Sequence, residues 1–209
     1  NFHIALGGAQ WFAPLGALLL LLVYGTPPIA LLSAIAYCVL HGASAYASKL
    51  GLREWRHNDS ELLEDLFDLM HRAEIDMSTF FRALAGIDAA QPQAAVLADA
   101  FYRADLRQRH AARLDRWLQR YAARLQRDAL PAAERAARMN AANPRFVLRN
   151  YLAQQAIDRA EGGDPTMIGE LLEVLRRPYD EQPGCAAFSA LRPDWARHRA
   201  GCSMLSCSS

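Results

Sequence analysis

Two cysteines near the end of the chain, Cys202 and Cys207, have the clearest capacity for chemistry in this sequence. Cys207 lies two residues from the last residue. A thiol in an exposed terminal segment is accessible to oxidation and disulfide exchange when it ionises to thiolate. The two cysteines do not form the CxxC pair that is typical of zinc sites. Spacing alone leaves two alternatives open: redox-active thiols, or an irregular tail whose cysteines have no function.

The remaining residue types show no catalytic pattern. The histidines have neither HExxH nor another paired spacing that suits zinc. The sequence also contains no glycine-rich phosphate loop, no GxSxG elbow and no Cys-His arrangement that sequence can support. We therefore predict no catalytic residue, no cofactor-binding residue and no metal ligand within this chain.

A stripe of arginines occupies one narrow sector of a predicted long helix. Its members are Arg109, Arg113, Arg116, Arg120, Arg124 and Arg127. Basic helices can bind nucleic-acid phosphates. However, residues 101–140 hold ten arginines against four acidic residues, a local net charge of +6, and residues 54–90 hold nine acidic residues against three arginines, a local net charge of −6. We therefore expect the two regions to dock on each other or face solvent, and we predict no nucleic-acid partner.

Apolar residues recur at three- and four-residue spacing along the chain, which predicts helices. We therefore expect an all-α fold, in which helices position the arginines described above. Ser60 is expected to be the N-cap of the first charged helix, and Pro131 the first residue of a later one. Three of the expected helices cover residues 78–85, 94–128 and 131–140. Three others are expected to start at Ser60, at the Asn143-Pro144 pair and directly after residues 162–165. Residues 87–93 are expected to form a loop.

Residues 1–48 contain no Asp, Glu, Lys or Arg. Two apolar runs flank a Gly-Thr-Pro-Pro sequence here, and the second approaches the ~20 residues that a helix needs to cross a bilayer. Two alternatives follow: a membrane hairpin formed by residues 11–47, or a pair of buried helices.

The composition divides the chain into three parts: a charge-free apolar segment (1–48), a helical domain (49–177) and an extended tail (178–209). The apolar residues 11–24 lack the positive flank and the cleavage site of a secretory signal, and four cysteines in 209 residues do not form a disulfide framework. A reducing, cytoplasmic setting is therefore expected.

Several stretches resemble the selenoprotein O family of kinase-like protein adenylyltransferases. The most specific are NPRFVLRN at residues 143–150 and PYDEQP at residues 178–183. The first of these runs belongs to a longer similar stretch over residues 139–157. The other similar stretches are residues 49–52, 76–84, 192–196 and the terminal Cys-Ser-Ser at 207–209. Together these stretches lie within residues 49–209 and resemble the C-terminal third of the family.

The resemblance implies a protein-kinase-like fold that binds ATP with a divalent metal, Mg or Mn, and transfers AMP to Ser, Thr or Tyr hydroxyls of other proteins. It also implies redox control by a cysteine or selenocysteine at the position of Cys207, whereas Cys202 is not part of the family pattern. Cys207 would pair with a thiol on a missing part of the enzyme or with Cys202. The family's nucleotide-binding and metal-binding motifs do not occur here and would lie upstream of Asn1.

We therefore expect the helical C-terminal part of a protein-kinase-like C-lobe, with a helical extension and an irregular tail. Its expected partners are the missing N-terminal kinase-like part and the protein substrates of the intact enzyme. Residues 143–150 are expected to be mainly structural, or to offer Arg145 and Arg149, four apart on one helix face, as anchors for a carboxylate or loop. The rival hypothesis is a membrane-anchored helical interaction module without enzymatic activity.

Overall fold

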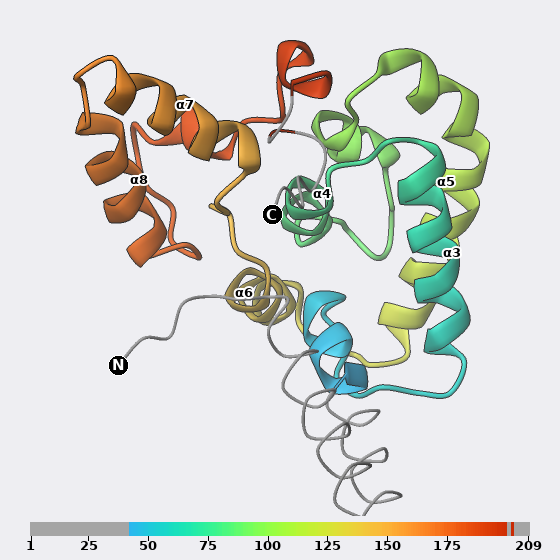
Figure 1. Cartoon of the computed structure of the whole chain (residues 1–209). Helices are drawn as coiled ribbons and strands as arrows, with labels where there is room; N and C mark the ends of the chain where they lie inside the picture. Colours follow the sequence, from blue (N-terminus) through green and yellow to red (C-terminus); the bar gives the residue numbers. More distant parts are fainter. Residues whose placement is uncertain (1–41, 200–201, 203–209) are drawn as a thin grey trace, which may run out of the picture.

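The computed structural model describes residues 42–199 and residue 202 of the chain. This part consists of helices joined by loops (Figure 1). The one β-type pairing within it is an isolated antiparallel bridge between Ile75 and Phe101. The prediction of an all-α fold is confirmed for these residues.

Six α-helices carry labels in the described part. They are α3 (Asp59–Arg72), α4 (Met77–Leu84), α5 (Ala104–Gln126), α6 (Ala132–Ala142), α7 (Asn150–Glu161) and α8 (Thr166–Arg176). The 3-10 helices are η1 (Ala94–Ala100), η2 (Ala186–Ser189) and η3 (Asp194–Arg197). Residues 42–49 are also helical. The expected helices over 78–85 and 131–140, the loop over 87–93 and the helix after 162–165 are confirmed within one to three residues. The expected irregular tail is confirmed for its described residues 178–199.

The larger apolar core is built around two aromatic residues of α5. The rings of Trp117 and Tyr121 stack with their centroids 5.2 Å apart, and both side chains are buried. Trp117 Nε1 donates a hydrogen bond to the carbonyl of Leu62 on α3 (2.8 Å), and the Tyr121 hydroxyl donates to the carbonyl of Leu50 (2.8 Å). Each ring therefore buries apolar surface while its polar atom finds a backbone partner.

A second, smaller core lies between α7, α8 and the tail. Its buried members are Tyr151, Leu152, Ala156, Met167, Leu171, Ala196 and Cys202. Figure 1 shows α7 and α8 side by side, away from α3 and α5. The extended segment over residues 143–149 connects the two cores along the chain.

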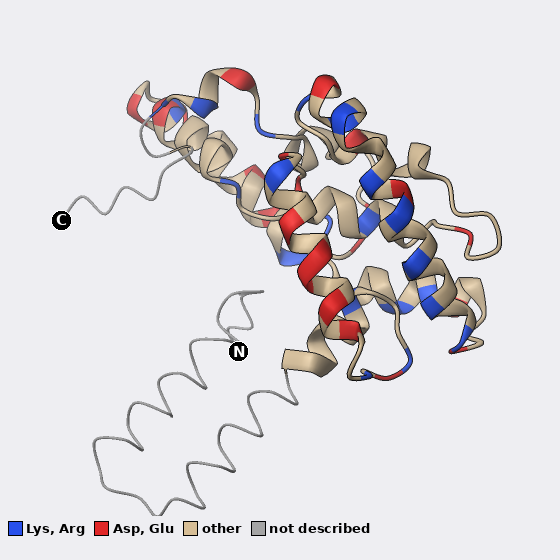
Figure 2. Cartoon of the chain, turned by 90° about the vertical axis from the view of Figure 1, so that its right-hand side faces the viewer, with Lys and Arg blue, Asp and Glu red and all other residues tan. Residues whose placement is uncertain are grey.

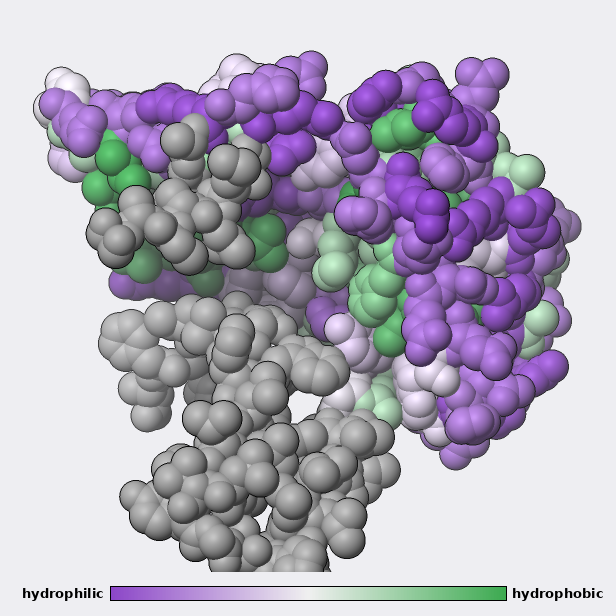
Figure 3. Space-filling model, turned by 45° about the vertical axis from the view of Figure 1, so that its right-hand side comes forward, coloured by the Kyte–Doolittle hydropathy of each residue, from purple (hydrophilic) through white to green (hydrophobic). Residues whose placement is uncertain are grey.

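Three arginines of the stripe dock on α3, which is one of the two arrangements that the charge balance predicts. Three pairs form across the helices: Arg113 with Asp68 (2.7 Å), Arg124 with Asp59 (2.7 Å), and Arg120 with Asp65. Figure 2 shows basic and acidic residues along these helices, and Figure 3 shows mostly hydrophilic residues on the face that carries α3 and α5. At least half of the stripe therefore takes part in intramolecular ion pairs.

Arg124 belongs to a buried cluster of charges. Its guanidinium also donates to a carboxylate oxygen of Asp128 (2.6 Å) and to the carbonyl of Glu54 (2.8 Å). The side chains of Arg124, Asp59 and Asp128 are 7%, 2% and 1% exposed. A buried charge that loses its partner is strongly destabilising, so this cluster fixes how α3 lies against α5.

The segment around Gly51 packs tightly against α6. Gly51 has φ +67, and a Cβ atom placed there would lie 2.7 Å from Cγ of Arg135 and from Sδ of Met139. Both the left-handed backbone and the close approach require glycine. Asn143 holds the same region, because its amide donates to the carbonyl of Lys49 (3.0 Å) and to that of Met139 (2.9 Å).

The predicted N-cap at Ser60 is wrong. Helix α3 begins at Asp59, and the Ser60 hydroxyl donates instead to the carbonyl of His57 (2.8 Å). The Asp59 carboxylate accepts from the backbone N–H of Arg56 (2.8 Å) while it also binds Arg124. The buried ion cluster therefore sets where this helix begins.

The predicted continuous helix over 94–128 is also wrong, because the backbone leaves the helix at residues 101–103. The backbone groups there pair across the bridge: Asp76 N–H donates to the carbonyl of Ala100 (2.8 Å), and Tyr102 N–H donates to that of Glu74 (3.3 Å). These long-range bonds replace the helical ones.

The predicted helix start at the Asn143-Pro144 pair is wrong as well. The segment over residues 143–149 is extended, and α7 begins at Asn150. The backbone N–H groups of Arg145 and Phe146 both donate to the carbonyl of Pro178 (2.8 and 3.0 Å). Pairing with the tail therefore replaces the first turn of the expected helix.

Among residues 42–199 and 202, no helix is both long enough and apolar enough to cross a bilayer. Of the segment considered as a membrane hairpin, only residues 42–47 belong to the described part.

Candidate functional site

A buried carboxylate joins the two cores. Asp76 is the N-cap of α4, where its Oδ1 accepts hydrogen bonds from the backbone N–H (2.9 Å) and the hydroxyl (2.7 Å) of Thr79. Arg149, directly before α7, reaches across and donates to both carboxylate oxygens, with Nη2 at 2.9 Å from Oδ1. This two-point pairing is the strong geometry for an arginine and a carboxylate.

The break in the helix at 101–103 supplies a third partner for Asp76. Tyr102 lies in the break, and its hydroxyl donates to Asp76 Oδ2 (2.9 Å). Burial alone would raise the pKa of Asp76, but the hydrogen bonds and charge of Arg149 and the bonds from Thr79 outweigh it and lower the pKa to about 2. Burial and the neighbouring Asp76 carboxylate raise the pKa of Tyr102 to about 12.

The tail adds further charges to this junction. Arg197 in η3 forms an ion pair with Glu74, next to the bridge. The guanidinium of Arg192 lies 5.2 Å from the ring centroid of Tyr102, a cation–π distance. The junction therefore gathers groups from α4, from the helix break, from the start of α7 and from the tail.

The two most specific sequence runs contact each other. Arg145 from the first run pairs with Glu181 from the second, and Arg82 on α4 pairs with the same carboxylate. Arg82 also donates to the carbonyl of Tyr179 (3.2 Å). The amide of Gln182 donates to two backbone carbonyls at the end of α8 (2.9 and 2.8 Å), so it caps that helix.

Arg145 and Arg149 were expected to share one helix face, which the structure contradicts. Both precede the first residue of α7, in extended backbone. They bind different carboxylates, Glu181 and Asp76. Sequence reasoning did not identify Asp76 or its partner Tyr102. The signal for Asp76 was available, because an aspartate three residues before a threonine at a helix start is a typical N-cap pattern.

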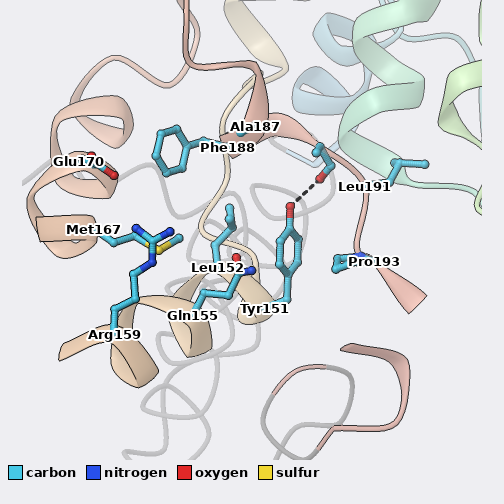
Figure 4. A pocket seen from close by; sticks show the side chains of 11 residues that line it. Tyr151, Leu152, Gln155, Arg159, Met167, Glu170, Ala187, Phe188, Leu191 and Pro193 are labelled. Atoms are coloured by element: carbon cyan, nitrogen blue, oxygen red, sulfur yellow. Dashed lines mark hydrogen bonds between the residues drawn. The ribbon is translucent and has the colours of Figure 1, made fainter. Parts of the chain in front are cut away.

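A groove of about 360 Å³ lies beside this junction, between α7, α8 and the tail (Figure 4). Its lining residues are Tyr151, Leu152, Gln155, Arg159, Met167, Glu170, Ala187, Phe188, Ala190, Leu191 and Pro193. The Tyr151 hydroxyl donates to the carbonyl of Ala190 (3.0 Å), which fixes one wall. Most of the lining side chains are apolar, whereas Arg159, Glu170 and Gln155 supply the polar groups.

Of the two cysteines that the sequence singled out, the structure describes only Cys202. Cys202 is buried, at 4% exposed, in the core between α7 and α8. Cys207 lies outside the described residues. Cys185, in the tail, is half-buried. The structure thus makes Cys202 a packed apolar residue, and the pairing of Cys207 stays a prediction.

The described part offers no cluster of ligands for the divalent metal that the family resemblance implies. Within residues 42–199 and 202, no three or more His, Cys, Asp or Glu side chains come together in a way that could hold a metal ion. The buried carboxylates Asp59, Asp76 and Asp128 are each bound to an arginine.

Comparison with known proteins gives consistent matches. The family described as protein adenylyltransferase SelO matches residues 36–176. The chain is 61% identical over 163 residues to the protein nucleotidyltransferase YdiU of Xanthomonas euvesicatoria, and 56% identical over 167 residues to that of Tolumonas auensis. These alignments cover 78% and 80% of this chain and 32% of each relative. The chain thus spans about a third of the length of these relatives.

Proposed function

This chain belongs to the protein adenylyltransferase SelO family, and on that premise we propose that it forms the helical C-terminal part of an enzyme that attaches AMP to proteins. In the proposed reaction, a Ser, Thr or Tyr hydroxyl oxygen bonds to the α-phosphorus of ATP. The bond from that phosphorus to the β-phosphate oxygen breaks, pyrophosphate leaves, and the hydroxyl proton passes to a base. The observation that carries the proposal is the family match over residues 36–176.

The proposed role of this chain is to support the catalytic part, which would belong to the two-thirds of the relatives' length that this chain does not span. Two observations favour this division. The described side chains offer no site for a metal, and the two most specific runs bind each other through Arg145 and Glu181. These charged side chains therefore hold segments of this chain together. In the intact enzyme these helices would buttress a kinase-like C-lobe.

Transfer of AMP from ATP labelled at the α-phosphate, with Mg or Mn present, tests the proposal. The comparison is between this chain and a version extended upstream to the length of the relatives. We expect protein labelling with the extended version only. Labelling by neither version would contradict the proposed activity, and labelling by this chain alone would contradict its supporting role.

We also propose that Cys207 forms a regulatory disulfide, as the family resemblance implies. A low-molecular-weight disulfide would be the oxidant: two protein thiols lose two electrons and two protons, and the oxidant becomes two thiols. Because Cys202 is 4% exposed, a thiol on the upstream part is the favoured partner. Mass spectrometry of the extended protein after oxidation should find Cys207 cross-linked. Its absence from any disulfide would refute this role.

A further inference from the structure

Helix α8 carries apolar residues on two sides. One side packs in the smaller core through Met167 and Leu171. The other side holds Ile168 and Leu172, which are 50% and 54% exposed, and the half-buried Leu175. These last three residues follow the i, i+4, i+7 spacing of one helix face, so they form a continuous row, here called the α8 stripe. A helix that is apolar on more than its core side is usually buried on both sides.

The large apolar residues that are exposed gather in the same region of the fold. The described part has eight of them, and six belong to residues 148–195, here called the α7–α8 unit. These six are Leu148, Ile157, Ile168, Leu172, Tyr179 and Trp195. Figure 3 shows hydrophobic residues on the side of the molecule that carries α7 and α8. Apolar residues that are exposed in one region mark an interaction surface, whereas scattered single ones do not.

The surface of α3 and α5 has a different chemistry. Its charged side chains pair within the chain, Arg113 with Asp68 and Arg120 with Asp65. An apolar partner would remove these charges from water without offering them a new hydrogen bond, which is unfavourable. The α7–α8 unit is therefore better suited to an apolar contact than the surface of α3 and α5.

The length of the relatives indicates what covers the α8 stripe. The family match over residues 36–176 includes all of α8, and the aligned part makes up 32% of each relative. The relatives therefore hold about twice as much chain again outside the aligned part, and this chain has to pack on some of its surface. A contact over the stripe removes apolar side chains from water, which stabilises it.

We propose that the α8 stripe packs against an apolar surface of the catalytic part, which this chain does not span. The inference rests on the proposed function, because it takes the partner from that proposal. In the intact enzyme Ile168 and Leu172 lie at the centre of the contact, and Leu175 extends it toward the end of α8. Helix α8 then packs on the smaller core with one side and on the catalytic part with the other.

Photo-cross-linking in the extended protein, without ATP, tests this contact. Benzoylphenylalanine replaces Leu172, and mass spectrometry maps the products. We expect cross-links within one molecule to residues of the upstream extension. The control position is Arg109 on α5, whose side chain is 67% exposed, and it should give less than about a tenth of that yield, because no apolar patch surrounds it.

Three outcomes would overturn the proposal. Cross-links only within residues 1–209, or no cross-link at all, would mean that the stripe stays uncovered. Cross-links only between two molecules would assign the stripe to a second copy of the protein.

The cross-link and the AMP transfer can fail separately. AMP transfer without the upstream cross-link would overturn the assigned surface and leave the proposed activity intact. The upstream cross-link without AMP transfer would support the surface and count against the proposed activity.

Hydrogen exchange gives a second measurement that needs no cross-linker. The double variant Ile168→Asp/Leu172→Asp should speed amide exchange in α8 at least about tenfold in the extended protein, but less than about twofold in this chain, where both side chains are exposed. Met77→Asp/Val96→Asp is the matched control, because it adds the same charge at two exposed apolar residues outside the α7–α8 unit. It should leave exchange in α8 unchanged in both proteins. An equal effect of the first variant in the two proteins would refute the contact.

Discussion

The guanidinium of Arg149 binds both oxygens of the Asp76 carboxylate, although the two residues are 73 positions apart in the chain. The same carboxylate caps α4 through Thr79 and accepts the hydroxyl of Tyr102. One buried side chain thus connects α4, the helix break and the start of α7.

Replacement of Arg149 by Met should destabilise the protein by about 3–5 kcal/mol, because it leaves the Asp76 charge buried without its partner. Urea unfolding followed by circular dichroism measures the change. The control is Arg176→Met, which removes an exposed pair with Glu173 and should cost about 0.5 kcal/mol or less. Similar losses in the two variants would show that the junction contributes no more than a surface pair.

The pH dependence of stability should also report on Asp76. Its folded pKa of about 2 lies below the ordinary value of 3.8, so its contribution is present above pH 4 and is lost as the pH falls from 4 to 2. The unfolding free energies of the wild type and Asp76→Asn should therefore converge by about 2 kcal/mol between pH 5 and pH 2. A constant difference across this range would contradict the assigned pKa.

Tyr102→Phe removes the hydroxyl that donates to Asp76 and should cost about 1–2 kcal/mol of stability, because the donor is lost from a buried carboxylate. Tyr179→Phe is the matched control, since Tyr179 is 39% exposed. Thermal unfolding at neutral pH measures both variants. If the two changes are equal, the hydroxyl of Tyr102 does not stabilise the junction.

How much of this structure the sequence predicts depends on the range of the interactions. The apolar periodicity and local stop signals predicted the positions of α4, α6 and α8 to within a few residues, because residues within and next to each helix determine where it begins and ends. The charge balance left open whether the arginine stripe docks on the acidic region or faces solvent, and the structure shows that three of its arginines dock on α3. These features are local or follow from composition.

The errors arise where a distant segment supplies the decisive bond. The break at 101–103 exists because residues 74–76 pair with it, and the extended segment before α7 exists because Pro178 accepts its backbone N–H groups. Neither partner is visible in a local window. The role of Asp76 needs Arg149 and Tyr102 together, and only the fold brings these three side chains into contact.

Gly51→Ala should destabilise the protein by about 2 kcal/mol or more, because the substitution meets both an unfavourable φ and a close contact with α6. Gly163→Ala separates the two effects, since Gly163 has φ +89 and nothing within 4 Å of the added Cβ. We expect the Gly163 variant to lose about 1 kcal/mol by urea unfolding. Equal losses would mean that α6 yields to the added methyl group.

Cys202 should react with alkylating reagents at least about tenfold more slowly than Cys185 in the folded chain, because only Cys202 is buried. Mass spectrometry of the peptides at successive times measures the two rates. In concentrated urea the rates should converge. Fast labelling of Cys202 in the folded protein would show that the cluster between α7 and α8 opens readily.

The helix over residues 42–49 ends in a set of bonds to the rest of the domain. The Lys49 carbonyl accepts from Asn143, the Leu50 carbonyl accepts from Tyr121, and the backbone N–H of Arg53 donates to Asp128 (2.7 Å). A connection held at three points does not act as a hinge. A force applied to the helix over residues 42–49 would therefore be transmitted to α5 and α6 as a mechanical torque, because these hydrogen bonds prevent free rotation at the connection.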